Sequence, residues 1–354
     1  MRLLKTAAIS AFHRLGLFAH LRDSWRAGLG RKGDPHGTLT RSIETAGRSL
    51  PANIEELHKQ LRRVKRENRT LRTAMAVDQR QRVRWNDLEA TLDEARIRSS
   101  VERALAAAMF ETVPMPHAVL HDVLPAATYD ALVEAIPGDE FFPDKDPVKQ
   151  NLRLQPLDTV PAWTQRGLTY LESTIIESIL GPAIVARMQP YLEEIYREEY
   201  GPSLGAGVAA VRHAPTAGRL MLRRPGYKLK PHLDPRRVTI TCLLYFARPG
   251  DNTAYGTELY EVDRPVTVDR SNTFYPGEHG YKCRLVKAVP FRPNSALVFL
   301  NRQGLHAAEI PKDAPRDTKR FAYQFYISPD PAALEHLVAD TALEGLPLSA
   351  AHTE

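Results

Sequence analysis

The residues best suited to metal chemistry in this chain are one short pair and one distant histidine. His232 and Asp234 form the only His-x-Asp sequence among the 354 residues. In an extended segment, side chains at positions i and i+2 point to the same face, so this imidazole and carboxylate can reach one ion together. A third ligand must arrive from another strand. His306 is the best candidate, because it follows an apolar strand and the short turn Asn301–Gly304.

Two histidines and one carboxylate form the facial triad of non-haem iron(II) oxygenases, which leaves coordination positions open for a 2-oxo acid and O₂. The far carboxylate of such a cosubstrate needs a cation. Arg320 begins an apolar strand and could clamp a carboxylate through two hydrogen bonds. Arg316 and Lys319 are alternatives in the polar loop before that strand. We favour Arg320, because a rigid element positions a ligand better than a loop does.

The elements that must position these residues form a run of strands in the second half of the chain. Helical patterns precede them over Ala126–Ile136 and Pro161–Tyr200, with a loop-like segment over Phe141–Val160. The predicted strands, rich in Val, Thr, Tyr, Phe and Leu, are Arg237–Phe246, Thr257–Val262, Lys282–Val289, Ala296–Leu300 and Phe321–Ile327. Helices followed by strands predict an α+β fold with a double-stranded β-helix (jelly-roll) core and supporting helices.

The N-terminal third has a different character. A helical pattern without Pro or Gly begins at Asn53 and continues to Pro114. Its seam residues step by three and four, and they are Ile54, Leu57, Leu61, Val64, Asn68, Leu71 and Met75. Such a heptad seam, with Asn68 on it, predicts a coiled coil and a homodimer through residues 54–75. The alternative is an amphipathic helix packed on the protein's own core.

Charge is distributed unevenly along the chain. Residues 1–110 contain 22 Lys and Arg and 12 Asp and Glu, whereas the remainder contains 26 and 30. The basic part could contact an acidic partner or a membrane surface. In basic-zipper proteins the cations precede the zipper, whereas here they lie alongside it. We therefore predict no specific nucleic-acid contact.

Domain organisation and compartment follow from these patterns. We expect a basic N-terminal helix and linker (1–52), a long helix (53–110), a catalytic domain (111–330) and a C-terminal helix and tail (331–354). No run of eighteen apolar residues exists, so we expect no membrane-spanning helix. The two cysteines, Cys242 and Cys283, lie in apolar strands and are expected to be buried and reduced, which favours a cytoplasmic protein.

Five stretches of the chain together resemble the prolyl-4-hydroxylase-like 2-oxoglutarate- and iron(II)-dependent oxygenases, in the order found in that family. They are Gly226–Pro235, Val238–Phe246, Gly256–Tyr260, Ser295–His306 and Arg320–Ile327, and the earlier Pro114–Pro125 resembles the opening strand of many bacterial members. The resemblance covers residues 112–328. It implies that His232, Asp234 and His306 bind iron, that Arg320 binds the distal carboxylate of 2-oxoglutarate, and that Tyr245 hydrogen-bonds this cosubstrate.

The resemblance implies a dioxygenase that hydroxylates its substrate and releases succinate and CO₂, with ascorbate as an accompanying reductant. Asp234 favours hydroxylation, because related halogenases lack this carboxylate and bind halide in its place. Two features depart from the family pattern. Arg320 follows His306 by 14 residues, a longer spacing than usual. The polar stretch Asp263–Tyr281 is long, and is either a substrate-covering loop or a surface insertion.

Other readings of the sequence remain. The β-rich part could be a non-catalytic binding or scaffold module that the coiled coil assembles, or an oxygenase that acts on nucleic acid through the basic region. His117, His121 and His213 lack metal-ligand spacing and are expected to be structural. No nucleophile-elbow, P-loop or dinucleotide-binding motif occurs, which removes support for hydrolase, NTPase and Rossmann-type functions. A protein side chain, a glycan and a small metabolite are all compatible substrates.

Overall fold

The computed structural model describes residues 55–65, 67–69, 71, 92–142, 146–153, 160–216, 218–235, 237–266, 272–301 and 304–343. The chain forms two units, Met1–Met75 and Ala76–Glu354. The predicted N-terminal basic helix and linker lie outside the described residues, as do residues 72–91 and the tail 344–354.

The described part of the first unit is helical at residues 55–65, 67–69 and 71. Ion pairs one turn apart support this helix, with Lys59 Nζ 4.0 Å from Glu55 and Arg63 Nε 2.8 Å from Glu67. Its large apolar side chains are exposed: Leu57, Leu61, Val64 and Leu71. The helix is as predicted, and its pairing into a coiled coil remains a prediction.

The prediction of one continuous helix from Asn53 to residue 110 is wrong. Leu92 and Asp93 are not helical, and helix α4 (Glu94–Ala107) begins anew after them. Asp93 is extended, and its carboxylate accepts the backbone N–H groups of Ala95 and Arg96, so it caps the new helix. Helix α4 then buries its apolar face in the core of the second unit, through Ile97, Val101, Ala104 and Leu105.

Two antiparallel sheets form the centre of the second unit. In spatial order the larger sheet contains β1 (Phe110–Glu111), β2 (His117–His121), β10 (Ser295–Leu300), β7 (Ile240–Tyr245), β12 (Arg320–Pro329), β5 (Arg219–Arg223) and β3 (Lys149–Arg153), with β4 (His213–Pro215) beside β12. The smaller sheet contains β6 (Lys228–His232), β11 (Leu305–Glu309), β8 (Thr257–Val262) and β9 (Cys283–Val289). The predicted α+β class is therefore confirmed.

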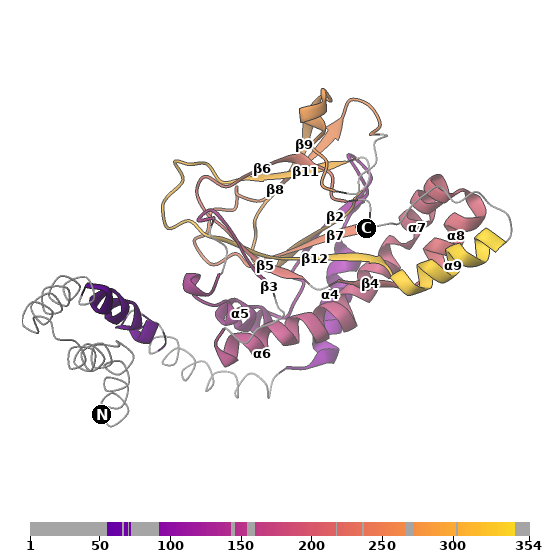
Figure 1. The fold of residues 1–354 in the computed structure, drawn as a ribbon. Helices are drawn as coiled ribbons and strands as arrows, with labels where there is room; N and C mark the ends of the chain where they lie inside the picture. Colours follow the sequence, from indigo (N-terminus) through magenta and orange to yellow (C-terminus); the bar gives the residue numbers. More distant parts are fainter. Residues whose placement is uncertain are drawn as a thin grey trace, which may run out of the picture. The chain divides into compact units, whose positions relative to one another are not determined.

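The larger sheet packs on different layers through its two faces, because successive side chains of a strand alternate between them. On one face, residues such as Leu220 and Leu244 join the helices in the main core. On the other face, Met221 and Tyr245 pack with Leu259 of the smaller sheet. Figure 1 shows the smaller sheet on one side of the larger one and helices α5 and α6 on the other. We call the face toward the smaller sheet the inner face.

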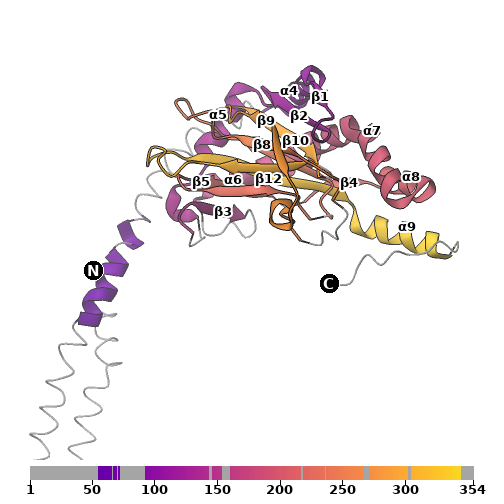
Figure 2. The same cartoon turned by 90° about the horizontal axis from the view of Figure 1, so that it is seen from above.

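Helices cover the outer face and one end of the sheets. They are α5 (Ala126–Ala135), α6 (Ala162–Tyr170), the π-helical η2 (Leu171–Leu180), α7 (Gly181–Tyr200), α8 (Pro202–Ala210) and α9 (Pro331–Leu343), with the short 3₁₀ turn η1 (Asp139–Phe141). A second 3₁₀ turn, η3 (Pro276–His279), lies beside β6 of the smaller sheet. Figure 2 shows α7, α8 and α9 beyond one end of the strands. The continuous helix Ala162–Tyr200 is long and apolar enough to cross a membrane by length and composition alone. Its apolar stripe, with Ile175 and Ile179, is buried in the core, as is typical of a core helix.

Four strands near the candidate site were not predicted, and they are β3, β5, β6 and β11. Phe141–Val160, expected to be a loop, contains strand β3, whose sequence Lys-Gln-Asn-Leu-Arg has one buried apolar residue. Strands β5 and β6 were also missed; they are joined through Gly226, whose φ of 91° provides the left-handed turn that glycine adopts without strain. Strand β11, which was also not predicted, carries His306 itself.

The two cysteines are both free. Cys242 is fully buried on β7, as expected, and burial raises the pKa of its thiol. Cys283 at the start of β9 is only half-buried, so the prediction of burial is wrong for this residue.

Candidate metal centre and cosubstrate site

The antiparallel pairing of β6 with β11 brings the two candidate histidines together. His232, the last residue of β6, is the direct partner of His306 on β11. Directly opposed residues of antiparallel strands share a face, and the two imidazole rings lie 4.1 Å apart. Asp234 follows His232 by two residues, and its carboxylate lies beside both histidines.

The three side chains form a buried cluster of possible metal ligands. His232 Nε2 lies 3.7 Å from Asp234 Oδ1, and His306 Nε2 lies 3.8 Å from Asp234 Oδ2. These distances are too long for hydrogen bonds. One ligand atom from each residue lies within 4.8 Å of the others, in the single such group among the residues that the structure describes. The donor set and its spacing fit one divalent ion held between three residues.

Neighbouring groups orient these ligands. His232 Nδ1 lies 2.9 Å from the carbonyl oxygen of Lys230, which places the proton on Nδ1 and leaves Nε2 free to bind a metal. Thr241 on β7 donates to Asp234 Oδ2 at 2.8 Å. Burial lowers the pKa of His232, and burial together with the neighbouring His232 lowers the pKa of His306 to about 3. Both imidazoles are thus neutral near pH 7, the form that binds metals.

Asn301 fastens the segment that carries Asp234. Its Oδ1 accepts the backbone N–H of Asp234 at 3.0 Å. Its Nδ2 donates to the carbonyl oxygens of Asp234, Pro235 and Val238 at 2.9 to 3.1 Å. From the sequence, Asn301 was predicted only as part of a turn. The sequence feature that could have indicated its role is its position, directly after an apolar strand and five residues before His306.

Arg320 lies on the inner face at the start of β12. Its side chain is buried, donates to Thr257 Oγ1 at 3.0 Å, and lies over the rings of Tyr245 and Phe291 at 5.4 and 5.7 Å. Its Nε has no hydrogen-bond partner, and no carboxylate pairs with it among the described residues. A buried guanidinium without a counter-ion is costly, so this site fits an added anion.

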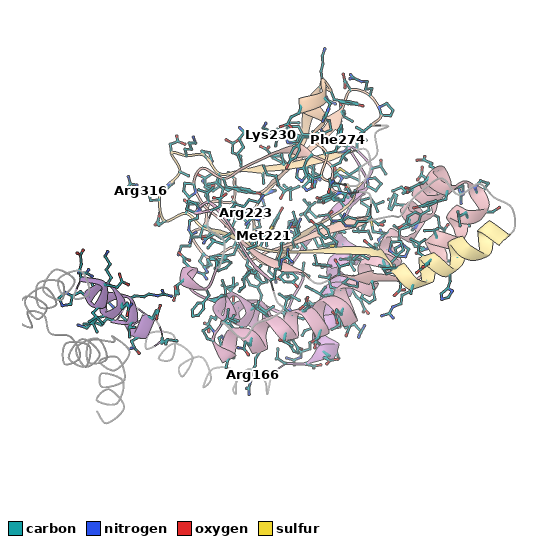
Figure 3. The ribbon with its side chains drawn as sticks, in the orientation of Figure 1. Arg166, Met221, Arg223, Lys230, Phe274 and Arg316 are labelled. Carbon is teal, nitrogen blue, oxygen red and sulfur yellow. The ribbon has the colours of Figure 1, made fainter. Side chains whose placement is uncertain are left out.

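The other predicted cosubstrate residue lies beside Arg320. The hydroxyl of Tyr245 donates to Thr257 Oγ1 at 2.7 Å, so Thr257 contacts both Tyr245 and Arg320. The alternative cation, Arg316, is exposed on the loop before β12 and lies at the outside of the fold (Figure 3).

Strand β7 connects the metal cluster with the arginine cluster. Thr241 and Tyr245 share the inner face of this strand. Thr241 hydrogen-bonds Asp234, and Tyr245 hydrogen-bonds Thr257, which also contacts Arg320. Four residues of a strand span ~13 Å. The long Arg320 side chain and a five-carbon dicarboxylate together can bridge this length.

The polar stretch Asp263–Tyr281 passes beside the metal cluster in its described part. Phe274 and Leu233 exchange both backbone hydrogen bonds, at 2.9 and 3.0 Å. The ring of Tyr275 then lies 5.6 Å from the ring of His232. This part of the stretch is therefore attached next to the candidate ligands, as a covering loop would be.

The remaining candidate histidines have structural contacts. His117 Nδ1 lies 2.8 Å from the carbonyl oxygen of Met115, and His213 Nδ1 lies 2.7 Å from that of Val211. His121 is exposed on β2. None of the three belongs to the metal cluster.

No protein-family model matches the chain, and no curated protein matches its sequence. A solved prolyl 4-hydroxylase from Phytophthora capsici is similar in structure at 14% identity and a TM-score of 0.36, over 67% of this chain and 65% of that one. A Pseudomonas putida prolyl-4-hydroxylase has 16% identity and a TM-score of 0.31, over 65% and 97%. The epimerase SnoN, solved with Fe³⁺ and alpha-ketoglutarate, has 14% identity and a TM-score of 0.35, over 73% and 93%. Prolyl 4-hydroxylases and other 2-oxoglutarate- and iron(II)-dependent oxygenases are thus solved proteins to which this chain is similar.

Proposed function

We propose that this protein is a 2-oxoglutarate- and iron(II)-dependent dioxygenase that hydroxylates its substrate and releases succinate and CO₂. One observation carries the proposal. Two buried neutral histidines and a carboxylate converge in the same inter-sheet region as a buried arginine that has no counter-ion. The pattern matches a metal that needs three protein ligands and a cosubstrate that needs one cation.

His232, Asp234 and His306 would hold the iron, which together with 2-oxoglutarate would supply the oxidising chemistry. The protein's own residues do the placing. Thr241 and Asn301 keep the Asp234 carboxylate and backbone in position, and the Lys230 carbonyl selects the His232 tautomer. Asp234 would occupy a ligand position on the iron, which favours hydroxylation of the substrate over halogenation.

Arg320, Thr257 and Tyr245 would bind the distal carboxylate of 2-oxoglutarate. Arg320 supplies the charge and has a free Nε–H donor. Thr257 supplies a hydroxyl between the arginine and the tyrosine. The aromatic rings of Tyr245 and Phe291 exclude water around the guanidinium, which strengthens its attraction to an anion. We further propose that the two sheets form the double-stranded β-helix expected for such a site.

Anaerobic titration with iron(II) and 2-oxoglutarate tests the proposal. We expect the weak visible charge-transfer band of a chelated 2-oxo acid to develop, and to be absent in His232→Ala and His306→Ala. His121→Ala, an exposed histidine away from the cluster, is the matched control and should keep the band. A folded protein that binds neither iron nor 2-oxoglutarate would contradict the proposal and favour a non-catalytic scaffold.

A further inference from the structure

The edge of the larger sheet carries a second group of cations on its inner face. Strand β3 pairs with β5 so that Lys149 is opposite Arg223 and Arg153 is opposite Arg219. Leu152 and Leu220 of these strands belong to the outer-face core, so the alternating residues Lys149, Arg153, Arg219 and Arg223 lie on the inner face. We call these four residues the edge cation cluster.

The arrangement of the edge cation cluster is unfavourable for the stability of the sheet. Like charges directly opposite on neighbouring strands destabilise a sheet. Here two such pairs lie on one face with the Asn151–Met221 pair between them, and Arg223 is in addition opposite Arg320 on β12. Among the described residues, no carboxylate forms an ion pair with any member of the cluster. The contacts of Arg219 are the amide oxygen of Gln324, at 2.9 Å from Nε, and the hydroxyl of Tyr326, at 3.4 Å.

Arg223 is the most constrained member. Its side chain is buried, and it donates to the carbonyl oxygens of Gln150 and Leu222 and to the Asn151 side chain at 2.6 to 3.0 Å. Its buried Nε has no hydrogen-bond partner. Figure 3 places Arg223 and Met221 in the region between the two sheets. A buried guanidinium that is held in place without a counter-ion can bind an anion from outside the chain.

Exposure decreases from the sheet edge toward the candidate site. Lys149 and Arg153 on edge strand β3 are exposed, Arg219 is half-buried, and Arg223 and Arg320 are buried. Positive charge that continues from solvent into a protein interior attracts anions and raises their local concentration. Positive charge thus continues from the exposed edge of β3 to the buried Arg223 and Arg320.

An anion near Arg219 would occupy a different place from the cosubstrate. Arg219 on β5 is opposite Gln324 on β12. Tyr326, the next inner-face residue of β12 after Gln324, is opposite Thr241 on β7, which donates to Asp234. Arg219 thus lies at the metal end of the inner face. Arg320 lies level with Arg223, ~13 Å away along β5. A 2-oxoglutarate that spans from the metal to Arg320 leaves Arg219 available.

We propose that the substrate of this enzyme carries an anionic group, a carboxylate or a phosphate or sulfate ester, which binds Arg219 and Arg153 beside the metal. The inference rests on the proposed oxygenase function and adds the substrate class to it. The anionic group would neutralise the opposed arginines and hold the substrate's C–H bonds near His232, Asp234 and His306. Neutral substrates would leave the cluster unpaired.

Calorimetric titration of the full chain with simple anions tests the proposal. The protein, loaded anaerobically with iron(II) and 2-oxoglutarate, is titrated with sodium sulfate and with sodium acetate at constant ionic strength set by chloride. We expect saturable binding that weakens roughly tenfold or more in Arg219→Gln and in Arg153→Gln, which each remove a charged donor. Arg316→Gln removes the same charge from an exposed loop and should leave binding unchanged. Tighter binding of sulfate indicates a phosphate or sulfate ester, and preference for acetate indicates a carboxylate.

Three results would overturn the proposal. They are no binding beyond the chloride background, equal losses in Arg219→Gln and Arg316→Gln, and a loss of 2-oxoglutarate affinity in Arg219→Gln with unchanged sulfate and acetate affinity. The same titrations on metal-free protein separate this inference from the proposed function. A chain that binds the anions through Arg219 but never binds iron or 2-oxoglutarate keeps the anion site and loses the oxygenase assignment.

Discussion

The side-chain amide of Asn301 holds Asp234 by both of its backbone polar groups. It accepts the Asp234 N–H at 3.0 Å and donates to the Asp234 carbonyl oxygen at 2.9 Å. Asn301 directly follows strand β10 of the larger sheet, while Asp234 follows β6 of the smaller sheet. This contact therefore links the two sheets at the metal cluster, and it sets where the carboxylate lies relative to the two histidines.

Asn301→Ala should weaken both metal binding and folding. Loss of the amide leaves a buried N–H and buried carbonyl groups unpaired, at a cost of about 1–3 kcal/mol for each group that stays unpaired. We also expect iron affinity to fall by about 10- to 100-fold, as for other partners that position ligands. Chemical denaturation and metal titration of the same samples measure both effects.

Asn294→Ala is the matched control for this variant. Asn294 is another buried amide, and it hydrogen-bonds both the backbone N–H and the carbonyl oxygen of Leu124 at 2.9 and 2.7 Å, away from the metal cluster. It should lose stability and retain iron affinity. Equal loss of iron affinity in both variants would show that Asn301 acts through general stability.

Arg320→Met should affect stability and binding in opposite directions. The buried guanidinium has no counter-ion in the unliganded chain, and replacing a buried charge by an apolar group of similar length often stabilises a protein by about 1–4 kcal/mol. The affinity for 2-oxoglutarate should fall by about 30-fold or more, because a charged hydrogen-bonded partner contributes roughly 2 kcal/mol or more. Thermal unfolding and anaerobic titration check the two effects. Arg316→Met should change neither, and a loss of 2-oxoglutarate binding there would move the cosubstrate site to the loop.

The metal-free protein should lose stability as the pH falls from about 6.5 toward 3. The pKa of His306 is lowered from its ordinary 6.5 to about 3, so in this window the unfolded chain binds a proton that the folded chain does not. The free energy of unfolding then decreases by about 1.4 kcal/mol per pH unit for one such group. His232, whose pKa is also lowered by burial, acts in the same direction.

Denaturation in the presence of a chelator, repeated across this pH range, measures the effect. His306→Gln should reduce the slope, whereas His121→Gln should not. A slope unchanged by His306→Gln would show that other groups cause the acid sensitivity.

The exposed seam of the first unit predicts self-association. Leu57, Leu61 and Val64 are 44–50% exposed on a helix with heptad spacing, and Asn68 lies on the same seam, as in parallel dimers. If this helix pairs with a second copy of the chain, Leu61→Glu should convert a dimer into a monomer in sedimentation equilibrium. Arg62→Glu, a neighbouring exposed position off the seam, should remain dimeric. A wild-type monomer at all concentrations would contradict the predicted pairing.

Local patterns in the sequence determined the candidate chemistry of this protein. The His232-x-Asp234 spacing predicts a shared face in any extended segment, and His306 and Arg320 were identified by their places at the ends of apolar strands. Strands such as Thr257–Val262 were predicted within a residue or two, because alternation of apolar side chains is a local property. The long helix was misjudged at Asp93, since a capping residue inside a helical pattern is ambiguous without its tertiary contacts.

Only the tertiary structure decided what those residues contact. The β6–β11 register placed His232 opposite His306, and burial distinguished Arg320 from the exposed Arg316. Asn301 contacts Asp234 across 67 residues of chain, and the edge cation cluster forms only where the polar strand β3 pairs with β5. Strand register and burial depend on the whole set of long-range contacts, whereas residue type and spacing are local. The sequence could therefore indicate the metal ligands, but the positioning residues and the unpaired positive charge became visible only in the folded chain.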